Sequence, residues 1–335
     1  MNNRVKWIDY AKAFAIFLVV FGHSGISGWT ALESVITGVH VPLFVFLSGY
    51  FARNKKQIIQ ATISDVKHLV LPFVLFSLIL IPFNICVQYI QGGSAMEQMV
   101  SNILTPKFWL SKFFMDDAYA CGPIWFLGAL FMIKMLFRSI AVIKSKINKE
   151  EMSDTDVWSA IVCVMIAIIL LYMDIVHSVH LMSVDSAFSL FPYYLLGALV
   201  PKKMFDGSNR GFIFSILLLL LYIFISINNG YISYDRSEFG NSFVVMYIEG
   251  VVGCLSIATL FSCLERFDMR ILSMLGKDSL TVLGLHIIFI QIFRFALKSV
   301  YGNELPLICL FAISFFICLM CVLLARTAIN RILPK

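Results

Sequence analysis

Residues 211–228 read GFIFSILLLLLYIFISIN, a stretch of 18 residues without a charged side chain. A helix needs about 20 mostly apolar residues to cross the hydrocarbon core of a bilayer, so this stretch predicts a transmembrane helix. Polar residues separate similar apolar runs along the whole chain, and we expect ten spans at 7–27, 33–51, 68–90, 122–141, 157–174, 187–200, 211–228, 243–264, 279–297 and 305–326. The sixth span is short and contains Pro192, so we expect it to be tilted or broken.

The composition of the chain agrees with a membrane protein. Of its 335 residues, 60% are hydrophobic and 14% are charged, whereas a soluble domain has roughly 45–50% apolar and about 25% charged residues. A mean hydropathy of +0.88 leaves too few polar side chains to cover a surface that faces water. We predict an all-α integral membrane bundle of about ten transmembrane helices. Residues 1–335 form a single transmembrane domain in this prediction, which disfavours a soluble domain, nucleic-acid binding and an ordinary cytosolic enzyme.

Lysines and arginines are distributed unequally between the two sets of loops. Of the 26, 20 lie in the terminal segments and in the loops of one face. The opposite loops contain only Lys107, Lys112, Arg236 and Lys298. Cytoplasmic loops carry an excess of basic residues, so we expect the basic face and both chain termini to be cytoplasmic.

The first two expected spans contain polar residues that are costly inside a bilayer. Lys12 and His23 are eleven residues apart, which brings both to nearly the same helix face, about 16 Å apart along the axis. Taken alone, Lys12 has a second interpretation, because a lysine near the end of a span can extend its ammonium group to the interface. His40 enters the second span at about the depth where His23 leaves the first. Two histidines can therefore meet near the outer leaflet and form a site.

Other polar residues within the spans suggest ion pairs. Asp9 precedes Lys12 by three residues, which is within pairing reach on a helix. We place Asp9 and His286 in the inner half of the membrane. Glu249 and Arg294 are expected at equal depths, a few turns below the outer surface, which predicts an ion pair with an architectural role. The chain has no C-x-x-C spacing of the kind that binds zinc, and we predict no metal site.

Six motifs, in order along the chain, resemble those of the membrane acyltransferase-3 family, especially its fucose 4-O-acetylase-like branch. They are KAFAIFLVVFGH (Lys12–His23), HVPLFVFLSGYF (His40–Phe51), KHLVLP (Lys67–Pro72), GPIWFLGALF (from Gly122), FGN (Phe239–Asn241) and LGKDSLTVLGLH (ending at His286). The first is similar to the family's Arg/Lys-x10-His motif and the second to its His-x-Pro-Leu-Phe-x-Phe-x-Ser-Gly-Tyr segment. In the third, His68 stands where the family usually has a second arginine or lysine.

The resemblance implies a membrane O-acyltransferase, and in particular an O-acetyltransferase of the bacterial inner membrane. Such an enzyme would move an acetyl group from cytoplasmic acetyl-CoA to a hydroxyl of a cell-surface or lipid-linked saccharide on the outer face. The resemblance also implies site residues: the catalytic residues His23, Lys12 and His40, with His23 as general base; Lys67, Arg53, Lys55 and Lys56 for the phosphates of acyl-CoA; and Trp125, Ser48, His286 and Asn241 for the acceptor. The expected partners are acyl-CoA, the saccharide and the bilayer, with an oligomer allowed.

A transporter or flippase of lipid-linked saccharides is the alternative function, because intramembrane charges and a proline-interrupted span would also serve transport. The lack of paired interrupted spans in the two halves of the sequence, together with the spacing of Lys12 and His23, favours the transferase. A purely structural scaffold would have no use for costly buried charges. The sequence leaves open the acceptor sugar, the choice between acetyl and succinyl, and whether His23 carries the acyl group transiently.

Overall fold

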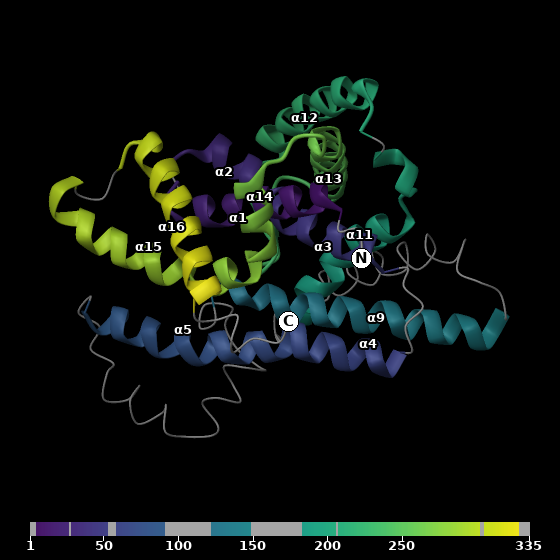
Figure 1. Ribbon diagram of the computed structural model, residues 1–335, viewed down its shortest axis with the longest axis horizontal. Coiled ribbons are helices and arrows are strands. Elements are labelled where there is room, and N and C mark those ends of the chain that lie inside the picture. The colour runs from purple at the N-terminus through teal and green to yellow at the C-terminus, as the bar shows by residue number, and fades with distance from the viewer. Residues whose placement is uncertain are drawn as a thin grey trace. The chain divides into compact units, whose positions relative to one another are not determined.

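The computed structural model describes residues 5–26, 28–52, 58–90, 122–148, 183–205, 207–301 and 305–327. Its main helices are α1 (Lys6–His23), α2 (Thr30–Thr37), α3 (His40–Tyr50), α4 (Ile58–Asp65), a π-helical segment (Val66–Val70), α5 (Leu71–Ile90), α9 (Trp125–Asn148), α11 (Val184–Leu199), α12 (Asn209–Asn229), α13 (Phe243–Leu264), α14 (Arg270–Lys277), α15 (Ser279–Tyr301) and α16 (Leu307–Thr327) (Figure 1). Short 3-10 turns cover Gly122–Ile124 and Lys202–Phe205. The strands β1 (Ile232–Ser233) and β2 (Glu238–Phe239) pair antiparallel between α12 and α13.

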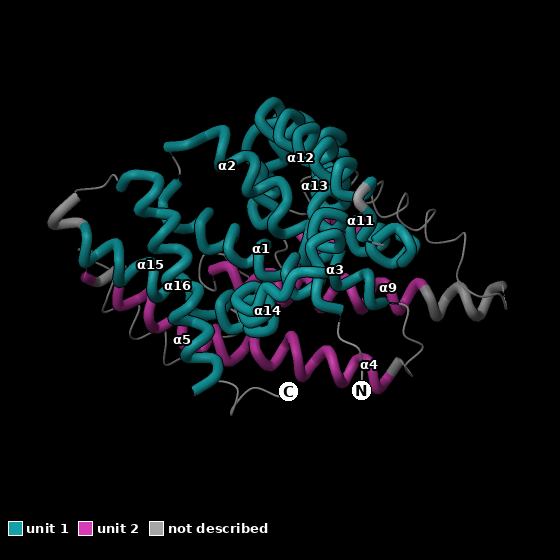
Figure 2. Tube along the Cα trace, turned by 45° about the horizontal axis from the view of Figure 1, so that its top comes forward, with its two compact units in different colours: residues 1–54, 193–333, 335 teal, residues 55–192, 334 magenta. Residues whose placement is uncertain are grey.

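The chain divides into two compact units (Figure 2). The first contains residues 1–54 and 193–333, and the second contains residues 55–192. The helix α11 crosses this boundary and continues through Pro192 to Leu199. Of the two expectations for this span, a tilt or a break, the break does not occur. In a membrane protein, neighbouring helices can satisfy the backbone group that loses its hydrogen-bond partner at a proline.

Seven helical segments of the described residues are long and apolar enough to cross a membrane. They correspond to seven of the expected spans: Thr30–Tyr50, Ile59–Val87, Gly122–Ile140, Arg210–Asn229, Phe243–Leu264, Ser279–Leu297 and Leu307–Thr327. Of the other three, 7–27 forms α1, which contains three charged residues, 187–200 forms the 16-residue α11, and 157–174 lies outside the described residues. The all-helical membrane architecture is confirmed, while the number of ten spans and the cytoplasmic termini remain predictions.

The second expected span is interrupted. The helix α2 ends at Thr37 and α3 begins at His40. Gly38 keeps helical angles (φ −64°, ψ −21°), but Val39 departs from them (φ −125°, ψ −28°). The span expected at 33–51 is present, but it consists of two helices instead of one. The helix α2 packs against α12, and α3 packs against α13, both of which are distant in the sequence.

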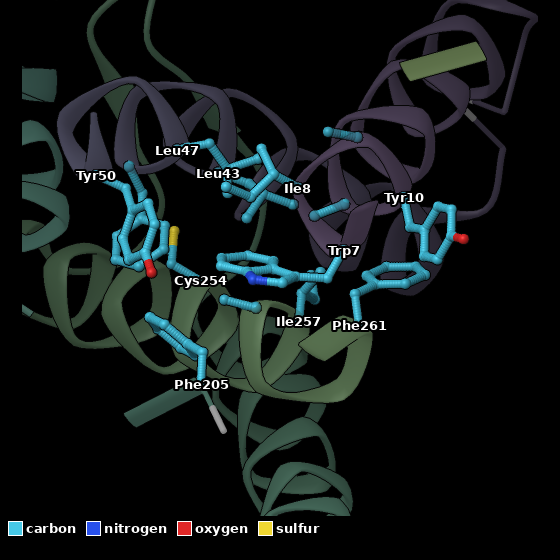
Figure 3. Packing of buried hydrophobic residues seen from close by; sticks show 14 of the residues in the cluster. Trp7, Ile8, Tyr10, Leu43, Leu47, Tyr50, Phe205, Cys254, Ile257 and Phe261 are labelled. Carbon is cyan, nitrogen blue, oxygen red and sulfur yellow. The ribbon is translucent and has the colours of Figure 1, made fainter. Parts of the chain in front are cut away.

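Trp7 lies at the centre of the core of the first unit and is 2% exposed. Its ring centroid is 5.5 Å from that of Tyr50 and 5.1 Å from that of Phe205. Figure 3 shows the indole of Trp7 between Leu43 of α3 and Ile257 of α13. This cluster fixes the beginning of α1, the helix that carries two of the predicted site residues.

The helix α14 packs directly on α1 through a glycine. A Cβ atom added to Gly276 would lie 1.9 Å from the carbonyl oxygen of Asp9, so the two main chains are in contact. Because α15 follows α14 after a single residue, this contact also decides where α15 starts relative to α1.

We expect Gly276→Ala to destabilise the protein. Overpacking in a core costs about 1–3 kcal/mol, and here the added methyl group meets main chain that cannot rotate away. Thermal unfolding in detergent measures the effect. Gly28→Ala is the matched control, since nothing lies within 4 Å of a Cβ at that position. Equal unfolding temperatures for the two variants would contradict the close contact of α14 with α1.

Candidate active site

The structure brings three histidines together in the first unit. His23 ends α1, His40 begins α3, and His286 lies in the third turn of α15. The ring centroids of His23 and His286 are 5.4 Å apart, with the ring planes inclined by 35°. His40 is close enough to His23 for their charges to interact. Residues from three separate elements therefore meet at one place.

The contact between His23 and His286 was not predicted from the sequence, which placed His286 in the inner half of the membrane and His23 at the outer end of its span. The depth of His286 in the membrane stays a prediction. Gly276 lies against Asp9 in the first turn of α1, and α15, which follows α14 after one residue, packs along α1. The ring of His286, in the third turn of α15, lies against the ring of His23.

The main chain fixes the tautomer of two of these histidines. Nδ1 of His40 lies 2.7 Å from the carbonyl oxygen of Ile36. Nδ1 of His286 lies 3.0 Å from the carbonyl oxygens of Val282 and Leu283. A carbonyl oxygen can only accept a hydrogen bond, so Nδ1 carries the proton in both rings. Nε2 of each neutral ring is then an acceptor that can take up a proton.

Nε2 of His286 is buried and has no hydrogen-bond partner in the part of the chain that the structure describes. Leaving a buried polar atom unpaired costs about 1–3 kcal/mol, so such an atom needs an explanation. The neighbouring ring, that of His23, is exposed. An unpaired acceptor beside an accessible imidazole can receive a hydrogen bond from a hydroxyl group of a substrate. Among the described residues, no three His, Cys, Asp or Glu side chains are arranged to bind a metal ion.

Arg294 holds the end of α1. Its Nη2 donates a hydrogen bond of 2.9 Å to the carbonyl oxygen of His23. The last carbonyls of a helix have no partner within the helix, so this bond satisfies one of them. Arg294 thereby fixes the main chain from which the His23 imidazole extends.

The ion pair expected between Glu249 and Arg294 was a wrong prediction. Glu249 is fully buried, and its carboxyl group contacts Ser226 Oγ at 2.6 Å and Asn229 Nδ2 at 3.0 Å, both on α12. Arg294 binds the main chain of His23 instead. A hydroxyl and an amide satisfy the buried acid without a cation. Neither group stood out in a sequence search for opposite charges.

Lys12 and Asp9 are both at least partly removed from solvent. Lys12 is half-buried, and Asp9 is 4% exposed. Both lie on α1, which ends at His23. The helix thus combines a half-buried lysine and an exposed histidine, separated by about 16 Å of helix.

Two predicted acceptor residues of the first unit lie in different surroundings. Ser48 is half-buried in α3, eight residues after His40. Asn241 is exposed, and its Nδ2 donates a hydrogen bond of 2.9 Å to the carbonyl oxygen of Asn228. Asn241 therefore closes the base of the β1–β2 hairpin.

The remaining predicted residues belong to the second unit or lie outside the described residues. Lys67 is exposed in the π-helical segment, and Trp125 is half-buried at the start of α9. The other members of the predicted acyl-CoA set, Arg53, Lys55 and Lys56, lie outside the described residues. The binding roles of these five residues therefore stay predictions.

The second unit contains a charged cluster that the sequence analysis missed. Asp65 is 7% exposed and pairs with Lys134 at 2.9 Å and with Arg138. Arg138 also donates a hydrogen bond of 3.2 Å to Thr62 Oγ1. The i, i+4 spacing of the two basic residues on one helix was the available signal. The cluster anchors the end of α4, where the π-helical segment with Lys67 begins, and such segments occur frequently at functional sites.

The comparisons with known proteins identify a family. A family model described as an acyltransferase domain, acyltransferase-3, matches residues 5–326. This range includes all three histidines and both units. The comparisons with curated proteins and with solved structures returned no match. The fucose 4-O-acetylase-like branch remains a prediction, but with nearly its whole length matched the chain belongs to the acyltransferase-3 family.

Proposed function

We propose that the protein is a membrane O-acetyltransferase that moves an acetyl group from acetyl-CoA on the cytoplasmic side to a saccharide hydroxyl on the outer side of the bacterial inner membrane. Family membership supports acyl transfer, and seven apolar helices support a reaction at a membrane. The excess of basic residues in one set of loops supports the direction. The observation that carries the proposal is the contact of His23 with His286, whose Nε2 has no partner among the described residues.

His23 is the proposed general base. Its imidazole takes the proton of the acceptor hydroxyl while the hydroxyl oxygen attacks the thioester carbon of acetyl-CoA. The new C–O bond forms, the C–S bond breaks, and the proton ends on the sulfur of free CoA. Nε2 of His286 accepts a hydrogen bond at the site, and His40 orients His23 or the acceptor. Ser48, Trp125 and Asn241 are proposed to contact the saccharide.

Acyl-CoA is proposed to reach His23 from the cytoplasmic side. Lys67, with Arg53, Lys55 and Lys56, would bind its phosphates. The separation of Lys12 from His23, about 16 Å along α1, is comparable with the length of an extended pantetheine arm. Lys12 would then offset negative charge on a phosphate or on the thiolate that leaves.

Mass spectrometry of surface glycans from cells with and without the gene tests this function. We expect loss of an acyl mass when the gene is absent. In liposomes that contain the purified protein, labelled acetyl groups should move from acetyl-CoA to the saccharide. Unchanged glycan acylation, combined with movement of lipid-linked saccharide that needs no acetyl-CoA, would support a flippase instead.

We expect Lys12→Ala to lose most of the acyl transfer and Lys12→Arg to keep a substantial part, because the proposed role needs positive charge. Calorimetric titration with acetyl-CoA should show a Kd raised about tenfold, which corresponds to about 1.4 kcal/mol. Lys203→Ala is the control, since Lys203 is exposed in a 3-10 turn. If Lys12→Ala binds acetyl-CoA and turns over like the parent, the lysine only extends to the interface.

A further inference from the structure

We propose that Glu249 is a positioning residue that is held as a neutral carboxylic acid and fixes the interruption between α2 and α3, where His40 lies. The protonation state and the contact with the interruption follow from the structure alone. The effect on acyl transfer rests on the proposed function.

The carboxyl group of Glu249 packs on the main chain at the end of α2. A Cβ added to Gly38 would lie 1.9 Å from Glu249 Oε1 and 3.0 Å from Tyr222 Oη. The φ angle of Gly38, −64°, is open to any residue, so space and not conformation requires glycine here. The helices α12 and α13, which supply these two side chains, lie side by side (Figure 1).

Side chains donate hydrogen bonds to two carbonyl groups at the end of α2, and the carbonyl of Ile36 also accepts from the N–H of Val39 at 3.5 Å. The Tyr222 hydroxyl donates a hydrogen bond to the carbonyl oxygen of Val35. His40 Nδ1 donates to the next carbonyl oxygen, that of Ile36, at 2.7 Å. In an uninterrupted helix both oxygens would accept from N–H groups four residues later. The imidazole of His40 is thus bonded to the last turn of α2, so whatever holds this turn also positions the ring.

The hydrogen bonds of Asn229 and Ser226 fix the protons around Glu249. Asn229 Oδ1 accepts from the N–H of Ser242 at 3.0 Å, so Asn229 Nδ2 faces Glu249 Oε2 as a donor. Ser226 Oγ lies 2.6 Å from Glu249 Oε1 and 3.0 Å from the carbonyl oxygen of Ser34. Two oxygen–oxygen hydrogen bonds need two protons, but a hydroxyl supplies one and a carbonyl supplies none.

The carboxyl group of Glu249 supplies the second proton. Oε1–H of Glu249 then donates to Ser226 Oγ, and the Ser226 hydroxyl donates to the carbonyl oxygen of Ser34, in the last turn of α2. No ion pair formed between described residues includes Glu249. A neutral acid also avoids the cost of an unpaired charge in a membrane interior.

The activities of two variants test the positioning role. Glu249→Gln stays uncharged and can donate to Ser226 and accept from Asn229, so it should retain most of the parent kcat. Glu249→Ala releases the end of α2, and we expect kcat to fall about 100-fold, the effect of a displacement of about 1 Å at a site. Ser256→Ala is the matched control on α13, because the Ser256 hydroxyl donates to Gly253 of its own helix and has no other hydrogen-bond partner among the described residues. A glutamine variant as impaired as the alanine variant would overturn the neutral-acid assignment.

Two measurements decide the proposal without an activity assay. The infrared difference spectrum between the parent and Glu249→Gln should contain the C=O stretch of a protonated carboxylic acid, and carboxylate bands in its place would overturn the proposal. This comparison needs no alanine variant, so it tests the protonation state of Glu249 even if Glu249→Ala does not fold.

The second measurement is the labelling of His40 by diethyl pyrocarbonate, mapped by mass spectrometry. The rate of labelling should change in Glu249→Ala but not in Glu249→Gln. An unchanged rate in folded Glu249→Ala would overturn the positioning role. An inactive parent would contradict only the proposed function.

Discussion

Replacing His23 with alanine is expected to abolish acyl transfer while the protein still inserts and folds. A general base contributes about 10²–10⁴-fold to the rate, so kcat should fall at least about 100-fold. The fold should survive because the His23 side chain is exposed and its carbonyl oxygen, which binds Arg294, remains in the variant. The assay follows labelled acetyl from acetyl-CoA to the glycan, and size-exclusion chromatography in detergent checks the fold.

Imidazole added to the assay separates a missing base from a damaged structure. It should restore part of the activity of His23→Ala, because the exposed position admits a small base in place of the side chain. Normal acylation by the purified, well-folded variant would refute the catalytic assignment of His23.

His286→Leu is expected to lower kcat about as strongly, but with unchanged or increased thermal stability. Leucine has a similar size and removes Nε2, the buried acceptor without a partner among the described residues. Removing such an atom relieves a cost of about 1–3 kcal/mol. The carbonyl groups of Val282 and Leu283 that contact Nδ1 belong to α15 and keep their helical partners. Loss of activity with gain of stability is the signature of a polar atom retained for function.

Thr259→Val is the matched control for His286→Leu. Thr259 Oγ1 is the other buried side-chain atom without a hydrogen-bond partner among the described residues. Thr259 lies in α13, in its C-terminal half, and has no proposed role in the reaction. We expect the valine variant to be at least as stable as the parent and fully active. If His286→Leu were equally active, the unpaired acceptor of His286 would have no part in the chemistry.

The helices could be predicted from the sequence because apolar runs between polar loops have few alternatives in a bilayer. The interruption at Gly38 could not, since the side chains that lie against it, Glu249 and Tyr222, are about 200 residues further along the chain. The third expected span similarly extends back from residue 68 to Ile58. The ion pairs of Asp65 with α9 hold this extension in place.

Part of the candidate site could be predicted from the sequence. A short connection between two apolar runs was enough to bring His23 and His40 to one place. The contact of His286 with His23 and the partners of Glu249 were not predicted. Depths counted from loop ends do not say which side chains of two packed helices meet. One partner of Glu249 is the uncharged residue Ser226, which pairing by opposite charge cannot predict.

The interruption in the second span also has an electrostatic consequence. The aligned peptide dipoles of α3 give its first turn a partial positive charge, equivalent to about half an elementary charge for a full helix. His40 and Val41 have N–H groups without an acceptor inside the helix, and Pro42, whose ring suits a first turn, has no N–H group. An oxyanion that forms beside His40 would therefore lie in a favourable field. Because this field comes from main-chain dipoles, it does not depend on pH. Replacing a charged side chain with a neutral one would not remove it.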